Sequence, residues 1–244
     1  MFRAKLSLPA FRHVVEALKD LTTEATFDVD PDGGMSLQAM DGSHVCLVAL
    51  AVPPSAMAEF ECPAPRSMSV HLGHLSKVLR CGRADVADLV LEASASDTLR
   101  VAFGDAEFEM RLLHIDSDVR LQVPDDDPEG AILLPSAEYA RVFRDLAGLG
   151  MDAVAFEAGR DGLVARAEGD GMTARIALSS TAMSAATCTV GMRHLVTFAR
   201  PGLSDVVTVA VAQDAPVHVA YAFGAGGRLD FYLAPKVVDE GDVE

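Results

Sequence analysis

The chain has 244 residues, half of them hydrophobic, and its 36 acidic residues outnumber 20 basic ones to give a formal net charge of −16. That length allows one large domain or two of ordinary size. The charge disfavours nucleic-acid binding unless the few cations gather on one surface, and no apolar run approaches the ~18 residues that a membrane span needs. Four isolated cysteines predict reduced, buried thiols rather than disulfides or a zinc site: Cys46, Cys62, Cys81 and Cys188.

The first half of the chain predicts a strand, a long helix, several strands, a short helix and further strands. Alternating apolar residues at 2–6 indicate the first strand. Apolar residues then follow Pro9 at helical spacing: Phe11, Val14, Val15, Leu18 and Leu21. A shorter helix is expected over 72–81, before strands at 88–93, 98–103 and 107–113.

Residues 37–50 (LQAMDGSHVCLVAL) predict two strands joined by a turn at Asp41-Gly42-Ser43. The aspartate can bond the backbone ahead of it, and Gly42 accepts a positive φ. Met40 and His44 flank this turn. Taken locally, a methionine that fills the core and a histidine that caps a strand explain the pair better than a binding surface does.

Residues 116–130 (DSDVRLQVPDDDPEG) interrupt the regular elements. Two prolines, a glycine and three consecutive aspartates disfavour helix and strand, so this segment is predicted to be a solvated linker. Leu121 and Val123 nevertheless place two apolar side chains in it.

After the linker the order of elements repeats. A strand at 131–134 precedes a helix over 135–146, three strands, a short helix around 192–199 and three more strands. The sequence LKDL at 18–21 matches FRDL at 143–146, and HLSKVLR at 74–80 matches HLVTFAR at 194–200. This duplication predicts two similar α+β domains, each with two helices packed on a largely antiparallel sheet.

Each of the four predicted helices carries basic side chains on its solvent face. These residues are Arg12, His13 and Lys19 on the first, Lys77 and Arg80 on the second, Arg141 and Arg144 on the third, and Arg193 and Arg200 on the fourth. One such helix would be an ordinary solvated surface. Four of them in an acidic chain indicate a surface that contacts nucleic-acid phosphates without reading sequence as strongly as they indicate ordinary solvated faces.

Enzymatic alternatives find little support in the sequence. No phosphate-binding G-x-x-x-x-G-K-[ST] or G-x-G-x-x-G motif is present, and Gly224–Gly227 fits a hairpin turn. His71 and His74 have H-x-x-H spacing but no third ligand nearby, so no metal site is predicted. Because no nucleophile, base and orienting group can be assembled, we expect no catalytic residues, no enzyme activity and no cofactor.

The hairpin sequence resembles the signature hairpin of the sliding DNA clamps of archaea and eukaryotes, the proliferating cell nuclear antigen (PCNA) family. Four further segments carry the resemblance: VVEALKDL at 14–21, LSKVLRC at 75–81, PSAEYARVFRDL at 135–146 and FYLAPKV at 231–237. The resemblance implies a DNA clamp fold in which three copies close into a pseudo-sixfold ring, with helices inside and sheets outside. The implied parts are an N-terminal clamp domain (1–115), an interdomain connecting loop (116–130), a C-terminal clamp domain (131–237) and an acidic tail (238–244).

The resemblance also implies a function. Such a homotrimer encircles duplex DNA through the nine basic positions above, acts as a processivity factor for DNA polymerase and serves as a docking platform for replication and repair proteins. The implied partners are a polymerase, a clamp loader and other proteins with a PCNA-interacting peptide, and no membrane is involved. The implied location is the nucleus in a eukaryote or a virus of eukaryotes, and the cytoplasm in an archaeon. A non-ring or heterotrimeric checkpoint-type clamp subunit remains the alternative.

Two further sites follow from the same resemblance. Partners insert a short helical turn into a groove, whose positions here are Met40, His44, Val45, Leu47, Leu121, Val123, Pro124, Ala215, Pro216, Tyr232, Ala234 and Pro235. Subunits pair an edge strand at 107–113 with one at 173–178 of the next copy, which also removes two exposed sheet edges. The expected apolar anchors of this interface are Phe108, Met110 and Ile176.

Overall fold

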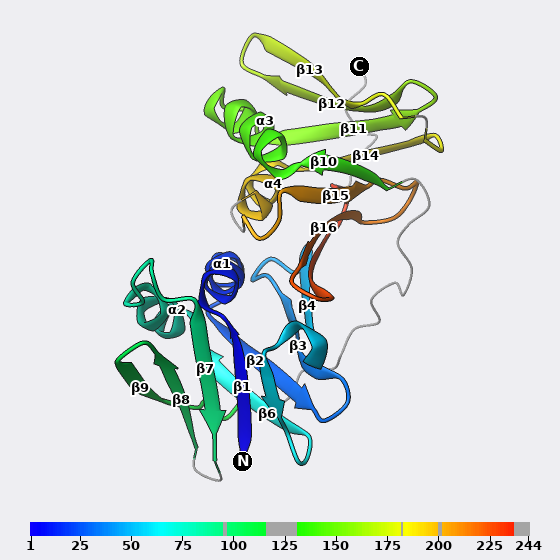
Figure 1. The fold of residues 1–244 in the computed structure, drawn as a ribbon. Coiled ribbons are helices and arrows are strands. Elements are labelled where there is room, and N and C mark those ends of the chain that lie inside the picture. The colour runs from blue at the N-terminus through cyan, green and yellow to red at the C-terminus, as the bar shows by residue number, and fades with distance from the viewer. Residues whose placement is uncertain (95–96, 116–130, 182, 200–201, 237–244) are drawn as a thin grey trace. The chain divides into compact units, whose positions relative to one another are not determined.

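A computed structural model of the chain describes residues 1–94, 97–115, 131–181, 183–199 and 202–236 (Figure 1). The predicted linker and acidic tail therefore lie outside the described residues. Contacts between residues divide the chain into two compact units. The first comprises Met1–Val123, Arg200–Ser204 and Tyr221–Asp230, and the second comprises Pro124–Ala199, Asp205–Ala220 and Phe231–Glu244.

The first unit contains two helices and two antiparallel sheets. Its elements are β1 (Phe2–Ser7), α1 (Leu8–Leu18), β2 (Glu24–Asp30), β3 (Gly34–Met40), β4 (Cys46–Val52), the 3-10 helix η1 (Pro54–Ala56), β5 (Glu59–Glu61), β6 (Arg66–His71), α2 (Leu72–Arg80), β7 (Asp88–Ala93), β8 (Thr98–Phe103) and β9 (Ala106–Arg111). One sheet has the order β5-β1-β7-β8-β9. In the other, β4, β3, β2 and β6 are neighbours in that order.

The second unit repeats this plan. Its elements are β10 (Ile132–Pro135), α3 (Ser136–Gly148), β11 (Ala153–Gly159), β12 (Gly162–Gly169), β13 (Met172–Ser179), β14 (Ala186–Gly191), α4 (Met192–Phe198), β15 (Val206–Ala210), β16 (Val217–Phe223) and β17 (Gly227–Leu233). One sheet has the order β13-β12-β11-β14, and β10 pairs with β15, which pairs with β16. The turn end of the β16–β17 hairpin, Tyr221–Asp230, belongs to the first unit.

Local sequence explains where the long helices begin. Ser7 caps α1 through its hydroxyl oxygen, which accepts from the amide of Ala10, and Pro9 occupies the first turn, where its missing N–H costs nothing. The buried face of α1 is Leu8, Phe11, Val14, Val15, Ala17 and Leu18. In each unit the two helices pack against one another, α1 on α2 and α3 on α4. The expected two-helix, antiparallel-sheet plan is confirmed for both halves.

The helix ends differ from the sequence-based expectation. The apolar spacing predicted that the first helix would run on to Leu21, but α1 ends at Leu18 and Lys19 is its C-cap. Beyond it the amides of Leu21 and Thr22 both donate to the carbonyl of Leu18, so a tight turn replaces the next helical turn. The last helix ends at Phe198, before Arg200, which lies outside the described residues.

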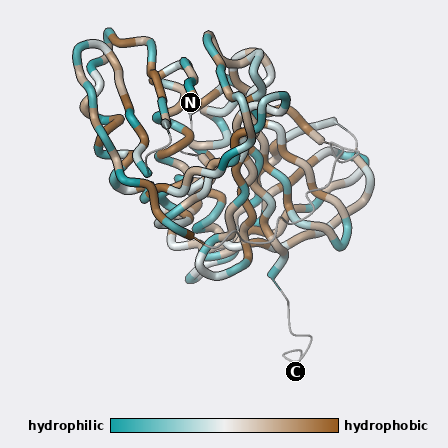
Figure 2. Tube along the Cα trace, turned by 90° about the horizontal axis from the view of Figure 1, so that it is seen from below, coloured by the Kyte–Doolittle hydropathy of each residue, from teal (hydrophilic) through white to brown (hydrophobic). Residues whose placement is uncertain are grey.

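Several strands in each unit bury every second residue, as in β1, where Phe2, Ala4 and Leu6 are covered while Arg3 and Lys5 are not. Figure 2 shows the hydrophobic segments concentrated in the interior strands and helices and the hydrophilic ones at turns. The prediction of four buried cysteines is wrong for two of them: Cys46 and Cys188 are buried, Cys62 is half-buried, and Cys81 is exposed. Within the described residues no helix has the length and apolar character to cross a membrane.

Candidate nucleic-acid interface and partner-binding site

Glu16 on α1 organises the basic side chains of the first helix pair. Its carboxylate accepts hydrogen bonds from Arg80 of α2 through both oxygens, at 2.9 and 2.7 Å, and from the Ser76 hydroxyl at 2.6 Å. The ammonium of Lys19 lies 2.6 Å from the same carboxylate. Two of the predicted DNA-binding cations, Lys19 and Arg80, therefore already have an acidic partner within the unit.

These partners make Glu16 a strong acid. Partial burial alone would raise the pKa of its carboxyl, but hydrogen bonds from Arg80, Lys19 and Ser76 outweigh it and lower the pKa from 4.5 to about 2. Glu16 is therefore charged throughout the physiological range. The bond to Glu16 raises the pKa of Arg80, which thus stays a cation.

Arg12 serves as a brace within the first unit. Its Nη2 donates to the carbonyl oxygen of Gly82, just beyond α2, at 2.8 Å, and the side chain is half-buried. A Cβ at position 82 would lie 2.9 Å from that nitrogen and 2.6 Å from Leu8, so the glycine makes room for the guanidinium. Arg12 therefore has a structural role in addition to its predicted role as a solvent-facing cation. The sequence pattern did not reveal this structural role.

The remaining cations are more open to solvent. His13 and Lys77 are exposed, and neither forms an ion pair with a described residue. In the second unit Arg144 and Arg193 are likewise exposed without an ion pair to any residue the structure describes. Arg141 makes a 3.4 Å contact with Asp145, one turn along α3, where both side chains are 62 % exposed. Such an exposed pair is weak and can exchange for a phosphate.

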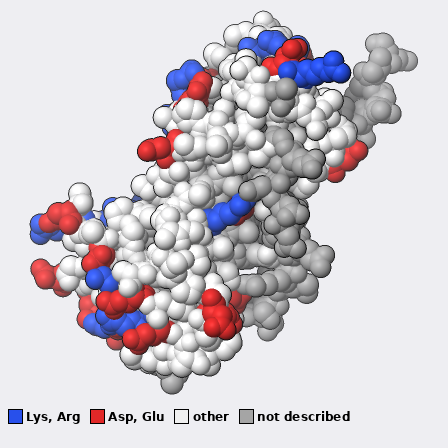
Figure 3. Space-filling model, turned by 45° about the vertical axis from the view of Figure 1, so that its right-hand side comes forward, with Lys and Arg blue, Asp and Glu red and all other residues white. Residues whose placement is uncertain are grey.

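Acidic side chains accompany many of the basic ones on the part of the surface drawn in Figure 3. On the face drawn in Figure 3, basic side chains mostly lie beside acidic ones and do not form one continuous patch. At Lys19, Arg80 and Arg141, which already have acidic partners, the binding of a phosphate must compete with a carboxylate. Chemically, the arrangement suits weak, sequence-independent contacts to a phosphate backbone, which salt would weaken further.

Asp41 holds the turn of the signature hairpin. Its Oδ1 accepts from the amides of Val45 and Cys46, both at 2.9 Å, and its other oxygen accepts from the Ser43 hydroxyl. The carboxylate is only 6 % exposed, so these bonds replace its water. The expected bonding of this aspartate to the backbone ahead of it is confirmed. The expected positive φ at Gly42 is wrong, because His44 adopts it instead, with φ 57°.

The hairpin presents apolar side chains on the face of the sheet opposite its core. Met40 and Leu47 are direct cross-strand neighbours and both are half-buried, whereas the next pair along, Ala39 and Val48, faces the other side. Val45 is 38 % exposed, and His44 beside it is exposed. These four predicted groove residues, Met40, His44, Val45 and Leu47, therefore share one end of one hairpin.

The other described groove residues lie in the second unit: Ala215, Pro216, Tyr232, Ala234 and Pro235. The half-buried ring of Tyr232 stacks on His218 with centroids 4.5 Å apart and planes 6° apart. The amide of Lys236 donates to the carbonyl of Thr189 at 2.7 Å, which fixes the chain after β17 beside β14. Leu121, Val123 and Pro124 lie outside the described residues.

The two predicted subunit-contact strands are both at sheet edges. β9 is the last strand of its sheet, and β13 is the first of its own. On β9, Phe108 and Met110 are half-buried and alternate with exposed Glu107 and Glu109. On β13 the half-buried Ile176 lies between exposed neighbours.

No group of three or more His, Cys, Asp or Glu side chains able to hold a metal occurs within the described residues. His71 and His74 stack ring on ring, with centroids 4.1 Å apart, and the His71 Nδ1 accepts from the amide of His74. This nitrogen caps α2, which gives the H-x-x-H spacing a structural reason.

Two duplicated units, each with a helix pair that carries cations and with sheets that end in open edges, define a subunit of the DNA clamp class. Comparison with known proteins names the family. Residues 1–128 match the family model for the N-terminal domain of proliferating cell nuclear antigen, and residues 122–236 match the model for its C-terminal domain. The chain belongs to the proliferating cell nuclear antigen family.

A solved structure supports the same assignment. The chain is similar to the crystal structure of proliferating cellular nuclear antigen from Entamoeba histolytica, with a TM-score of 0.88, 28 % sequence identity, and coverage of 97 % of this chain and 99 % of that one. The protein is accordingly a sliding clamp and processivity factor of DNA replication. Its family is a non-catalytic clamp scaffold that binds DNA and polymerase or other partners, in the nucleus or, in archaea, in the cytoplasm.

Proposed function

We propose that three copies of the chain close into a ring around duplex DNA by pairing β9 of each copy with β13 of the next. The observation that carries this proposal is that both strands are sheet edges. An open edge leaves backbone donors and acceptors unpaired, and pairing between copies would satisfy them. Phe108, Met110 and Ile176 are the proposed apolar anchors, because they alternate with exposed polar or small residues on these strands.

The helices are the proposed DNA-facing surface of this ring. The basic positions are Arg12, His13, Lys19, Lys77, Arg80, Arg141, Arg144, Arg193 and Arg200. We assign the largest share of phosphate contact to His13, Lys77, Arg144 and Arg193, which are exposed and form no ion pair with another described residue. The proposed domains are 1–115 and 131–237, joined by the loop 116–130 and followed by the tail 238–244.

The signature hairpin, the linker and the C-terminal segment form the proposed partner groove. The half-buried pair Met40 and Leu47 supports this assignment, because apolar side chains on the outer face of a sheet suit the apolar face of a short helical turn. The proposed ligands are PCNA-interacting peptides of a DNA polymerase, a clamp loader and repair proteins. The proposed role is not catalytic. The proposed location is that of the DNA on which the clamp acts, which is the nucleus in a eukaryote and the cytoplasm in an archaeon.

Light scattering tests the ring. We expect a particle of three times the 25.8 kDa subunit mass at micromolar concentration. A monomer across a range of salt would refute the homotrimer and favour the alternative, a checkpoint-type subunit that works alone or with unlike subunits.

Clamp-dependent DNA synthesis tests the DNA-facing helices. Reversal of two open cations in the double variant Arg144→Glu/Arg193→Glu should shorten the products of a clamp-dependent polymerase and leave the trimer intact. Arg160→Glu is the matched control, because Arg160 is exposed at the turn between β11 and β12, away from the helices. Unchanged product length in the double variant would remove the helices from the proposed DNA surface.

A further inference from the structure

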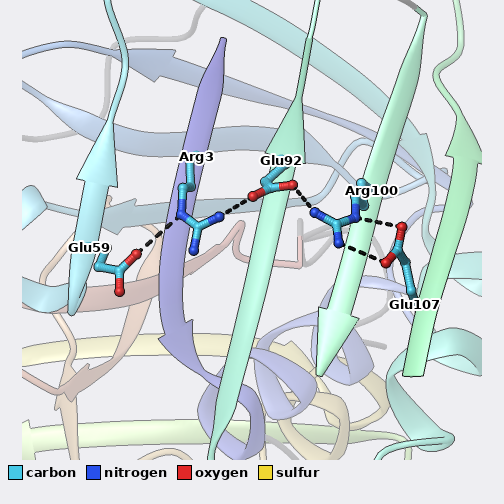
Figure 4. Close-up of polar contacts among 5 residues, drawn as sticks. All are labelled: Arg3, Glu59, Glu92, Arg100 and Glu107. Carbon is cyan, nitrogen blue, oxygen red and sulfur yellow. Dashed lines mark hydrogen bonds and ion pairs between the residues drawn. The ribbon is translucent and has the colours of Figure 1, made fainter. Parts of the chain in front are cut away.

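A row of alternating charges crosses the outer face of the first unit's five-stranded sheet, the face that carries Arg3 and Lys5. It runs through Glu59, Arg3, Glu92, Arg100 and Glu107, one residue from each strand (Figure 4). Arg3 lies 3.2 Å from Glu59 and also pairs with Glu92. Arg100 bridges Glu92 and Glu107, and its bond to Glu107 is 2.7 Å long.

The row ends in negative charge at the β9 edge. Hydrogen bonding to Arg100 lowers the pKa of Glu107, which keeps this last carboxylate ionised. Glu109 follows two residues along β9, so it lies on the same outer face and is exposed. It forms no ion pair within the described part of the chain. Its cross-strand neighbour Arg100 bonds Glu92 and Glu107 instead. Arg111, the next residue on this face, is also exposed and forms no ion pair with a described residue. The edge therefore presents Glu109 as an unpaired carboxylate among the described residues.

The edge strand of the second unit has the opposite imbalance. On its sheet Glu157 of β11 pairs with Arg166 of β12 at 2.7 Å. The next strand places Arg175 directly opposite Arg166, and Arg175 forms no ion pair with a described residue. Like charges directly opposite in a sheet are destabilising. Arg175 on β13 is thus an exposed cation at an open edge, with a second cation behind it.

We propose that Arg175 pairs with Glu109 of a second copy of the chain, and that this ion pair sets the register in which β13 and β9 meet. The inference rests on the edge-to-edge assembly proposed above and adds its register and its electrostatic contact. The β9 edge of each copy therefore binds the β13 edge of another copy.

The register that pairs Glu109 with Arg175 satisfies both faces of the joined sheet. Every strand pair described in both units is antiparallel, so we take the new pair to be antiparallel. Setting Glu109 opposite Arg175 then sets Phe108 opposite Ile176 on the core side and Met110 opposite Ala174. A slip of one residue would place charges on the core face, so the apolar alternation excludes it.

Charge complementarity also answers a problem of assembly. Copies that each carry a net charge of −16 repel one another at long range. The unpaired carboxylate of Glu109 on one edge and the unpaired guanidinium of Arg175 on the other give these two positions a local attraction.

A charge-swap cycle tests the ion pair in the full-length protein. Glu109→Arg and Arg175→Glu should each raise the dissociation constant of the oligomer by about tenfold, measured by analytical ultracentrifugation on dilution, because each creates a like-charge contact. The double swap should return it to within about threefold of the wild type. Arg160→Glu, with the same charge change at an exposed turn, should have no effect.

Glu168 is the intramolecular competitor for Arg175, since it lies on the same outer face of the neighbouring strand, diagonal to Arg175. If Glu168 were the functional partner of Arg175, Glu168→Gln would weaken the oligomer as much as Arg175→Glu does. The double swap Glu109→Arg/Arg175→Glu would then not restore the dissociation constant. Either result overturns the inference. Both leave the homotrimer itself untouched.

Cross-linking tests the register independently. In the background Cys62→Ser/Cys81→Ser, the variant Glu109→Cys/Arg175→Cys should form an intermolecular disulfide, because residues directly opposite in antiparallel strands have Cα atoms about 4.5–5.5 Å apart. Cysteines at 107 and 175 should cross-link much less. Preferential cross-linking of 107 with 175 in an intact trimer overturns the register, whereas a wild-type protein that stays monomeric overturns the proposed ring as well.

Discussion

Removal of the Glu16 charge gives the sharpest test of the basic helices. The carboxyl pKa falls from 4.5 to about 2 in the folded chain, and the full difference would correspond to about 3 kcal/mol of stability at neutral pH. Because 23 % of the side chain is exposed, solvent screens part of this interaction, and we take about 1–2 kcal/mol. Glu16→Gln should lower the free energy of unfolding of the first unit by that amount at pH 7.

The pH dependence has a defined sign. A carboxyl whose pKa is lower in the folded state stabilises the fold fully above its unfolded pKa, near 4.5, and this contribution is lost as the pH falls through about 2. The stability difference between wild type and Glu16→Gln should therefore be constant above about pH 5 and should shrink steadily below about pH 4.5.

DNA affinity should change in the opposite direction. Without the carboxylate, Lys19 and Arg80 lose their shared acceptor and become free to contact phosphates. Two added phosphate contacts would steepen the slope of log K against log salt by about 2, since each contact to B-DNA contributes ~0.9. The variant should thus be less stable yet bind DNA more tightly at low salt.

Urea unfolding and DNA binding across a salt series measure the two effects. Glu24→Gln is the control, because Glu24 is an exposed carboxylate at the start of β2 and the variant has the same charge change. A Glu16→Gln protein with unaltered stability would show that the hydrogen bonds to Glu16 do not hold the helix pair together. An unaltered salt slope would show that Lys19 and Arg80 do not face DNA.

Two backbone predictions follow from the turns. Asp41→Ala should lower the free energy of unfolding by about 2–3 kcal/mol, because buried hydrogen-bond donors lose their acceptor. Gly42→Ala is the control and should change it little, because the added Cβ would meet no atom within 4 Å. Gly162→Ala should cost more than about 2 kcal/mol, since its φ is +100° and the new Cβ would lie 1.9 Å from the Ser179 oxygen; Gly159→Ala, which meets nothing within 4 Å, is the control. Urea denaturation curves read out both pairs, and equal midpoints within either pair would contradict the reasoning.

The order of elements could be predicted because it depends on local patterns. Alternation at period two and spacing at 3.6 residues are set by the chain itself, and both survive in the burial of β1 and α1. The end of α1 could not be predicted in the same way, since Leu21 continues the apolar spacing while the backbone turns after Leu18. The positive φ at His44 was also missed, because Asp41 bonds the two amides that follow His44 and thereby fixes the turn.

The site was predicted less completely because its acceptors come from tertiary contacts. The spacing of Glu16 and Lys19 on one helix is visible in the sequence and could have indicated their ion pair. The bonds from Ser76 and Arg80 come from another helix, 60 and 64 residues away, and no local pattern contains them. A count of cations in the sequence therefore overestimated how many are available to contact phosphates. It left out the carboxylates and the carbonyl oxygen that already bind some of them.

Those acceptors fit the mechanics of a clamp that has to slide. A cation with no other partner gains most from a phosphate and would hold DNA in place, whereas a cation that leaves Glu16 or Asp145 gives up one ion pair as it forms another. The net gain at each step is then small, and neighbouring phosphates become nearly equivalent. On the proposed DNA-facing helices, Lys19, Arg80 and Arg141 have such partners, while Arg144 and Arg193 supply contact without this exchange. On the proposed surface, these acidic side chains would therefore weaken DNA binding and at the same time lower the barrier to movement along the DNA.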